Sequence, residues 1–151
     1  RRVEIAQRAG IEAFVPHGGL IAAFRQRLPD GADVIVDATG APAVLAEAIE
    51  LAKDVPWGEA PGHSARYLVQ GSYPDVLCIP YQPAFRKELV LLMSRDEGPR
   101  DLRTVLDLMQ RGRLRTRDLI SAVVSPERAP EIYQSLKAQS NMLTAVFQWG
   151  N

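Results

Sequence analysis

Short apolar runs alternate along the chain with stretches whose apolar residues recur at helical spacing. Residues 34–36 are all β-branched, which is typical of a strand buried on both faces. Helical spacing follows in Leu45, Ala48, Ile49 and Ala52. Residues 66–71 then form a second strand, which is apolar at 67–69 and ends in Gly71. A strand, a crossover helix and a second strand predict a parallel sheet and therefore an α/β fold.

The same reading predicts further elements on both sides of this unit. We expect helices at 1–9 and 20–28, from Pro99 to just before Gly112, and from Ser125-Pro126 onward, and strands at 13–15, 89–93, 119–124 and 143–149. The stretches 54–64 and 73–85 contain several prolines and are expected to be irregular connections. Trp57 lies in the first of them, and we expect it to pack on the sheet; the alternative is a lid or a substrate contact.

Small residues follow both strands of the central unit. They are Ala38, Thr39 and Gly40 after the first strand, and Gln70, Gly71 and Ser72 at the end of the second. Parallel sheets bind ligands at the carboxyl ends of their strands, so these six residues are candidates for a nucleotide-type site. Small residues also suit helix caps and strand ends, and both explanations can hold together.

Charge and composition argue against several classes of partner. The formal net charge is zero, which argues against nucleic acid or an anionic membrane as a partner. No apolar run approaches the roughly 20 residues of a membrane span, and a single cysteine, Cys78, fits a reducing compartment, so we expect a cytoplasmic protein. His17, His63 and Cys78 have no metal-ligand spacing, and no metal is expected within this chain.

Six segments in order carry a resemblance to a known family. They read RRVEIAQRAG at 1–10, VIVDATG at 34–40, RYLVQGSY at 66–73, FRKELVLLMSR at 85–95, LRTVLDLMQRGRLRTRDLIS at 102–121 and SPERAPEIYQSL at 125–136. Together they resemble the carboxyl-terminal part of the medium-chain dehydrogenase/reductase family, the zinc-type alcohol dehydrogenases. The resemblance implies a partial NAD(P)-binding Rossmann domain at 1–93 and a segment at 94–151 that returns to the catalytic domain.

The resemblance also implies a function and adds two site residues. It implies an NAD(P)-dependent oxidoreductase that moves hydride between nicotinamide and a small alcohol or carbonyl substrate. Arg2 would lie near the adenosine ribose, or pair with the 2′-phosphate if the cofactor is NADP. Leu92 would lie beside the nicotinamide, with the six small residues at the strand ends completing the cofactor contacts.

The departures from the family pattern limit what this chain could do alone. The glycine-rich phosphate turn, the acidic residue that ends the second strand and the domain with the zinc ligands are all absent from the sequence. We therefore expect a part of a longer protein, with no catalytic residue and no zinc of its own, and inactive in isolation. The alternative is a non-catalytic nucleotide-binding or interaction module of the same fold.

Residues 89–93 read Leu-Val-Leu-Leu-Met and would lie at the edge of a Rossmann sheet. An exposed apolar edge needs a partner or a cover. We expect a homodimer joined through this strand, as the family resemblance also implies. The alternative is that residues 73–85 cover the edge.

Overall fold

The structure, a computed structural model, describes residues 1–58, 64–73, 76–95, 97–138 and 141–150. The chain divides into two compact units, Pro16–Asp96 and a second unit made of Arg1–Val15 with Glu97–Asn151. The prediction that 1–93 is a cofactor-binding domain and 94–151 a segment of the catalytic domain stays a prediction, because a division by contacts does not test it.

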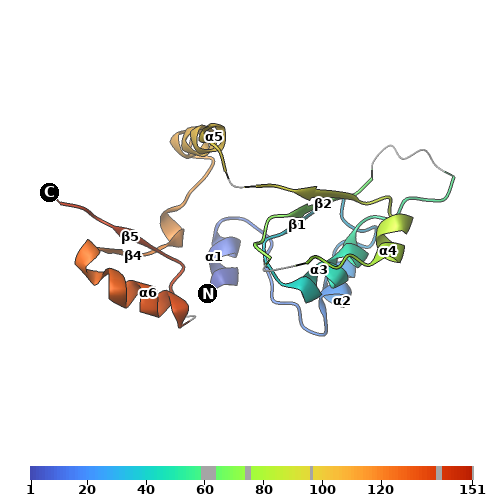
Figure 1. The fold of residues 1–151 in the computed structure, drawn as a ribbon, viewed down its shortest axis with the longest axis horizontal. Helices are drawn as coiled ribbons and strands as arrows, with labels where there is room; N and C mark the ends of the chain where they lie inside the picture. The colour runs from blue at the N-terminus through green and yellow to red at the C-terminus, as the bar shows by residue number, and fades with distance from the viewer. Residues whose placement is uncertain (59–63, 74–75, 96, 139–140, 151) are drawn as a thin grey trace. The chain divides into compact units, whose positions relative to one another are not determined.

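A parallel three-stranded sheet forms the centre of the unit Pro16–Asp96 (Figure 1). Its strands are β1 (Val34–Asp37), β2 (Arg66–Val69) and β3 (Val90–Met93), in the order β1-β2-β3. Val34 is paired with Arg66, and Arg66 with Val90, so all three strands are in step. The predicted α/β fold with a Rossmann-type parallel sheet is confirmed.

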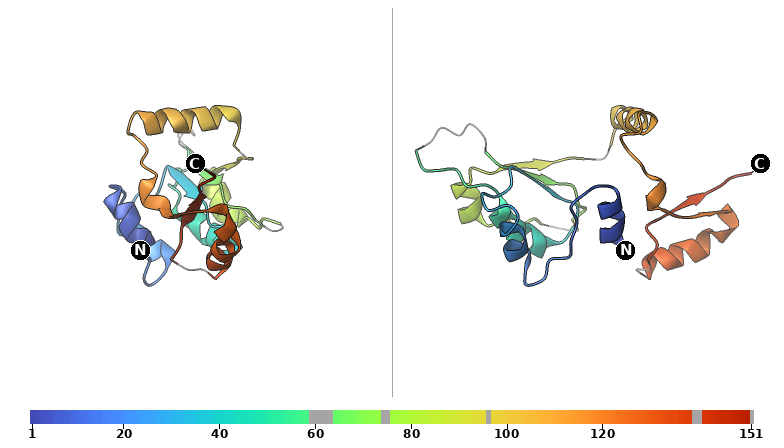
Figure 2. Two further views of the ribbon diagram at one scale, coloured as in Figure 1. Left: turned by 90° about the vertical axis from the view of Figure 1, so that its left-hand side faces the viewer. Right: turned by 180° about the vertical axis from the view of Figure 1, so that it is seen from behind.

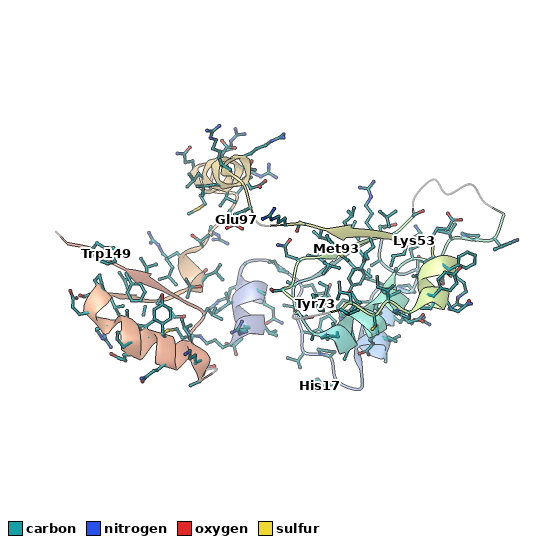
Figure 3. All side chains as sticks on the ribbon, viewed as in Figure 1. His17, Lys53, Tyr73, Met93, Glu97 and Trp149 are labelled. Atoms are coloured by element: carbon teal, nitrogen blue, oxygen red, sulfur yellow. The ribbon has the colours of Figure 1, made fainter. Side chains whose placement is uncertain are left out.

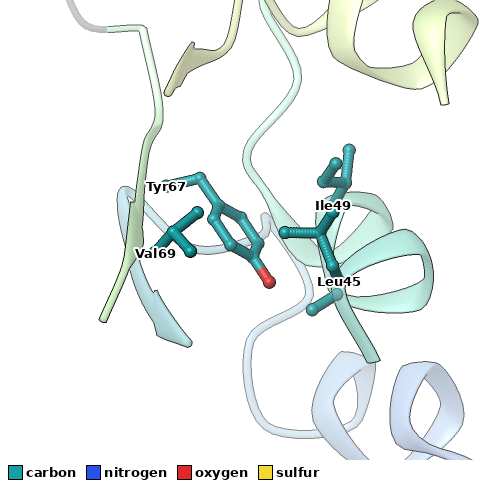
Figure 4. Close-up of a cluster of buried hydrophobic side chains, with 5 residues drawn as sticks. Leu45, Ile49, Tyr67 and Val69 are labelled. Carbon is teal, nitrogen blue, oxygen red and sulfur yellow. The ribbon is translucent and has the colours of Figure 1, made fainter. Parts of the chain in front are cut away.

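Helices cover one face of this sheet. They are α2 (Leu20–Arg25), α3 (Pro42–Ala48), which continues into the 3₁₀ turn η1 (Ile49–Leu51), and α4 (Tyr81–Arg86) (Figures 1 and 2). The core lies between α3 and β2, where Tyr67 and Val69 face Leu45 and Ile49 (Figure 4). Tyr67, Leu45 and Ile49 are fully buried.

The opposite face of the sheet is open in the described residues. Val34 and Val36 are 60% and 57% exposed, and Leu92 on the same face is 44% exposed. The prediction that residues 34–36 are buried on both faces was therefore wrong. The cause is that described helices pack on one face only, and that β1 has no described strand on its outer side.

The second unit contains another parallel pair of strands. It comprises α1 (Arg2–Arg8), α5 (Pro99–Gln110), η2 (Arg117–Leu119), β4 (Ile120–Val124), η3 (Pro126–Arg128), α6 (Ala129–Lys137) and β5 (Thr144–Phe147). β4 pairs with β5, and α6 connects them as the sequence predicts. Ile5 of α1 and Ile132 of α6 are its buried apolar residues among those described.

Three expectations about the elements were wrong. Residues 13–15 form no strand, and they pair with none of the described strands. The stretch 73–85, expected to be irregular, contains α4. Trp57 does not pack on the sheet, since its side chain is 96% exposed. Among the helices that the structure describes, none has the length and apolar character to cross a bilayer.

Candidate functional site at the carboxyl edge of the sheet

The carboxyl ends of all three strands of the central sheet meet at one edge, because the strands are parallel and in step. β1 leads into 38–40, β2 into 70–72, and β3 into Ser94. The hydroxyl of Ser94 donates to Oε1 of Gln70 at 3.4 Å, which links the ends of β3 and β2. Six of the eight predicted site residues therefore lie at this edge: Ala38, Thr39, Gly40, Gln70, Gly71 and Ser72.

The two small-residue turns are in direct backbone contact. A Cβ atom built on Gly71 would lie 2.3 Å from the backbone nitrogen of Gly40, and one built on Gly40 would lie 2.5 Å from the carbonyl oxygen of Ser72. Gly40 also has φ of 66°, a left-handed conformation that favours glycine. The structure thus gives both glycines a packing reason, whereas contact of either with a cofactor stays a prediction.

Asp37, the last residue of β1, holds these turns together. Its side chain is 4% exposed, which is unusual for a carboxylate. Oδ1 accepts from the N–H of Thr39 at 2.9 Å and from its hydroxyl at 2.6 Å. Oδ2 accepts from the hydroxyls of Tyr67 at 2.9 Å and of Tyr73 at 2.5 Å. The main-chain carbonyl of Asp37 accepts from the N–H groups of Gln70 and Gly71, both at 2.8 Å.

These contacts set the ionisation of the cluster. Burial raises the pKa of Asp37, but the hydrogen bonds from Thr39, Tyr73 and Tyr67 together lower it by more. The pKa of Asp37 therefore lies below its ordinary value. Burial and the bond to Asp37 raise the pKa of both tyrosines, Tyr67 the more strongly. The cluster is therefore one carboxylate with neutral donors around it.

The outer surface of this edge is small, neutral and polar. Ala38, Thr39, Gln70 and Ser72 are exposed, while the acid beneath them is buried. Hydroxyl, amide and backbone groups of this kind can hydrogen-bond the hydroxyls or the carboxamide of a ligand. A charged group at this surface is not needed for such contacts.

Two of the predicted residues are not in the turns that follow β1 and β2. Arg2 belongs to α1 in the other compact unit, and Leu92 lies on the open face of β3, one residue before the strand ends. Sequence reasoning missed Asp37 and Tyr73, the latter labelled in Figure 3. An acid that closes a buried β-branched run was the available signal, because a buried carboxylate requires donors nearby.

A cavity of about 460 Å³ runs along the free edge of β1. Apolar residues such as Leu20, Phe24, Ile35 and Val44 line much of it, and it reaches Asp37 and Thr39 at the carboxyl end. His17 and Cys78 are exposed, and His63 lies outside the described residues. Within the described ranges, no three histidine, cysteine or acidic side chains come together so that they could hold a metal ion.

Comparisons with known proteins agree with this architecture. The chain is 29% identical over 119 residues to the probable D-xylulose reductase A of Aspergillus clavatus, a match that covers 79% of this chain and 31% of the relative. No protein-family model matches the chain.

Two solved structures share the fold. 2R,3R-butanediol dehydrogenase from Bacillus subtilis superposes with a TM-score of 0.82 at 18% identity, over 99% of this chain and 41% of the other. A short chain alcohol dehydrogenase from Escherichia coli CFT073, in complex with the cofactor NADH, gives 0.81 at 19% identity, over 98% and 42%. The chain thus spans less than half the length of the proteins that it matches here.

Proposed function

We propose that this chain is the carboxyl-terminal portion of a member of the medium-chain dehydrogenase/reductase family. In this proposal it supplies part of the NAD(P) site of a dehydrogenase for a polyol or another small alcohol. The observation that carries the proposal is the meeting of three parallel strand ends, with small exposed residues after two of them. Such edges are where open α/β sheets bind ligands. The relative named as a xylulose reductase supports the polyol class.

Each predicted site residue has a role in this proposal. Thr39, Gln70 and Ser72 offer neutral polar groups to the ribose and carboxamide of the cofactor, while Ala38, Gly40 and Gly71 keep the backbone accessible. Arg2 contacts the adenosine ribose or its 2′-phosphate, and Leu92 contributes apolar surface next to the nicotinamide. The bound cofactor supplies the hydride chemistry, and these residues bind and orient it.

The resemblance to the zinc-type alcohol dehydrogenases implies a zinc ion in the complete protein. Zinc takes histidine, cysteine and carboxylate ligands, usually four in a tetrahedron. Within the described ranges no such group is assembled. These residues do not fit a zinc ion, and no step of the proposed reaction is assigned to one.

The proposed assembly is a homodimer joined through β3. This strand lies at an edge of the described sheet and carries Val90, 40% exposed, and Met93, 60% exposed and labelled in Figure 3. The N–H of Val90 donates to the carbonyl of Ala65, the residue before β2, so by alternation the N–H groups of Leu91 and Met93 face the free edge. Two copies could pair antiparallel along these groups.

Sedimentation tests this assembly. Met93→Pro removes one free-edge donor without touching the bonds to β2, and we expect it to shift the complete protein from dimer to monomer. Gln82→Ala, at an exposed position of α4, is the neutral control. A wild-type protein that sediments as a monomer would exclude the interface.

Cofactor titration tests the proposed site. Ala38 is exposed at the carboxyl edge, so Ala38→Trp fills the ligand space without displacing the core. We expect the dissociation constant of NADH or NADPH to rise at least tenfold in the complete protein. Ala46→Trp, the same change at an exposed position of α3, is the matched control and should bind like the wild type.

Equal affinity in all three proteins would place the cofactor elsewhere. Binding that is lost only in Ala38→Trp, but with no oxidation of any polyol or small alcohol, would favour a nucleotide-binding module over a dehydrogenase.

A further inference from the structure

The two oxygens of the buried Asp37 carboxylate serve different segments of the chain. Oδ1 is occupied by the N–H and hydroxyl of Thr39, in the turn after β1. Oδ2 is occupied by two phenol hydroxyls, that of Tyr67 within β2 and that of Tyr73 beyond its end. A single carboxylate therefore bridges the two turns that form the candidate site.

The bridge extends to the start of α3. The hydroxyl of Thr39 donates to Asp37 and accepts from the N–H of Ala41 at 3.2 Å, and Ala41 is the N-cap residue of α3. The side chain of Asp37 thus fixes the path from β1 to the helix on one side and the path beyond Ser72 on the other. Charge-assisted bonds of this kind are stronger than neutral ones.

The backbone contact between Gly40 and Gly71 makes this arrangement sensitive to small shifts of either turn. The turns touch closely enough that no Cβ atom fits between them, so a shift of either turn changes the surface presented at the edge. The carbonyl of Asp37 already holds Gln70 and Gly71 through backbone bonds. The hydrogen bond from the Tyr73 hydroxyl to Asp37 is the side-chain contact that holds the chain after Ser72.

We infer that Asp37 is a positioning residue for the cofactor site, and that its bond to Tyr73 sets the placement of residues 70–73 against residues 38–41. The inference rests on the proposed function of this edge. Asp37 itself is buried and does not touch the ligand. It acts by keeping exposed groups, such as Thr39 and Gln70, at a fixed separation.

The two tyrosines provide a matched test, because each donates one hydroxyl to the same oxygen. Tyr67 is fully buried in the core and lies within the sheet, whereas Tyr73 is half-buried and follows the sheet. Tyr73→Phe should release the turn, and Tyr67→Phe should only weaken the core. If Asp37 merely stabilised the fold, any loss of cofactor affinity in the two variants would follow their loss of stability.

The experiment uses the complete protein and titrates NADH and NADPH by nicotinamide fluorescence, followed by steady-state kinetics. For Tyr73→Phe we expect a rise of about fivefold or more in the cofactor dissociation constant and KM, with kcat within twofold of the wild type. For Tyr67→Phe we expect affinity within twofold of the wild type and a lower urea midpoint. Asp37→Asn should reproduce the loss of affinity, and if it fails to fold, the tyrosine pair still decides.

Three outcomes are distinguishable. If the wild type binds neither cofactor, the proposed function is wrong. If the wild type binds and Tyr73→Phe binds equally well, the positioning role is wrong while the proposed function stands. If both tyrosine variants lose affinity in proportion to their loss of stability, Asp37 is a structural residue only and the inference is overturned.

Discussion

Replacing Gly71 with alanine is expected to destabilise the protein through a clash between two backbone turns. The added Cβ would lie 2.3 Å from the nitrogen of Gly40, 3.0 Å from its Cα and 3.1 Å from the nitrogen of Thr39. Ordinary contacts between such atoms are about 3.5 Å, so the closest overlap is roughly 1 Å. Because the opposing atoms belong to the backbone, no side-chain rotation can relieve it.

The magnitude follows from two opposing effects. Overpacking of this kind costs about 1–3 kcal/mol, and a rigid backbone contact belongs at the upper end. Removing a glycine restricts the unfolded chain and returns about 0.4–1 kcal/mol. The expected net loss in the free energy of unfolding is about 2 kcal/mol.

Urea unfolding followed by circular dichroism measures this loss. Ser72→Ala, at the exposed neighbouring position, is the control and should change stability by less than about 0.5 kcal/mol. A Gly71→Ala protein as stable as this control would refute the reasoning, because the turns could then not approach as described. The test concerns packing alone, so it does not depend on any ligand.

Three further predictions concern the same unit. Asp37→Asn should destabilise the protein at pH 7, and the difference from the wild type should shrink as pH falls below about 3.9, the ordinary pKa of aspartate. A pKa held below that value gives stability that is present above it and is lost as pH falls through the folded pKa. A difference between wild type and variant that does not shrink over this range would contradict the prediction. Lys87→Met should lower the free energy of unfolding by about 1–3 kcal/mol, because the buried Nζ donates to the carbonyl of Ala52 and to Asp54 Oδ1, both at 2.6 Å, and the buried carbonyl would lose its partner. Asp54→Asn should lower the free energy of unfolding by less in the same urea assay, and the reverse order would contradict the prediction. Residues 1–151 expressed alone should bind the dye ANS and unfold without a sharp transition, because the apolar cavity along β1 and the open face of the sheet lack cover in the described residues; a sharp high-temperature transition in a dilute monomer would count against it.

The sequence predicted the strand–helix–strand unit well because its signals are local. A β-branched run, a helix with apolar residues at regular spacing and a proline at its first position define β1, α3 and β2 without reference to the rest of the chain. Residues 13–15 show the opposite case. Their apolar character favours a strand, but a strand also needs a partner across hydrogen bonds, and residues 13–15 pair with no described strand.

Burial was predicted less well for the same reason. The burial of Val34 and Val36 depends on what packs on the far face of the sheet. The burial of Trp57 depends on what packs beside its loop. The site shows a further limit. The small residues at the strand ends mark the edge, but the bridge from Asp37 to Tyr73 joins residues 36 positions apart, and only the folded chain brings them together.

Hydrogen exchange of the complete protein, with and without NADH or NADPH, tests the central claim most directly. Cofactor should slow exchange in peptides covering 38–41 and 70–73, at the carboxyl ends of β1 and β2. Peptides covering 53–58, at the opposite end of the sheet, should exchange at the same rate in both samples. Protection confined to segments outside 38–41 and 70–73, at saturating cofactor, would contradict the placement of the site.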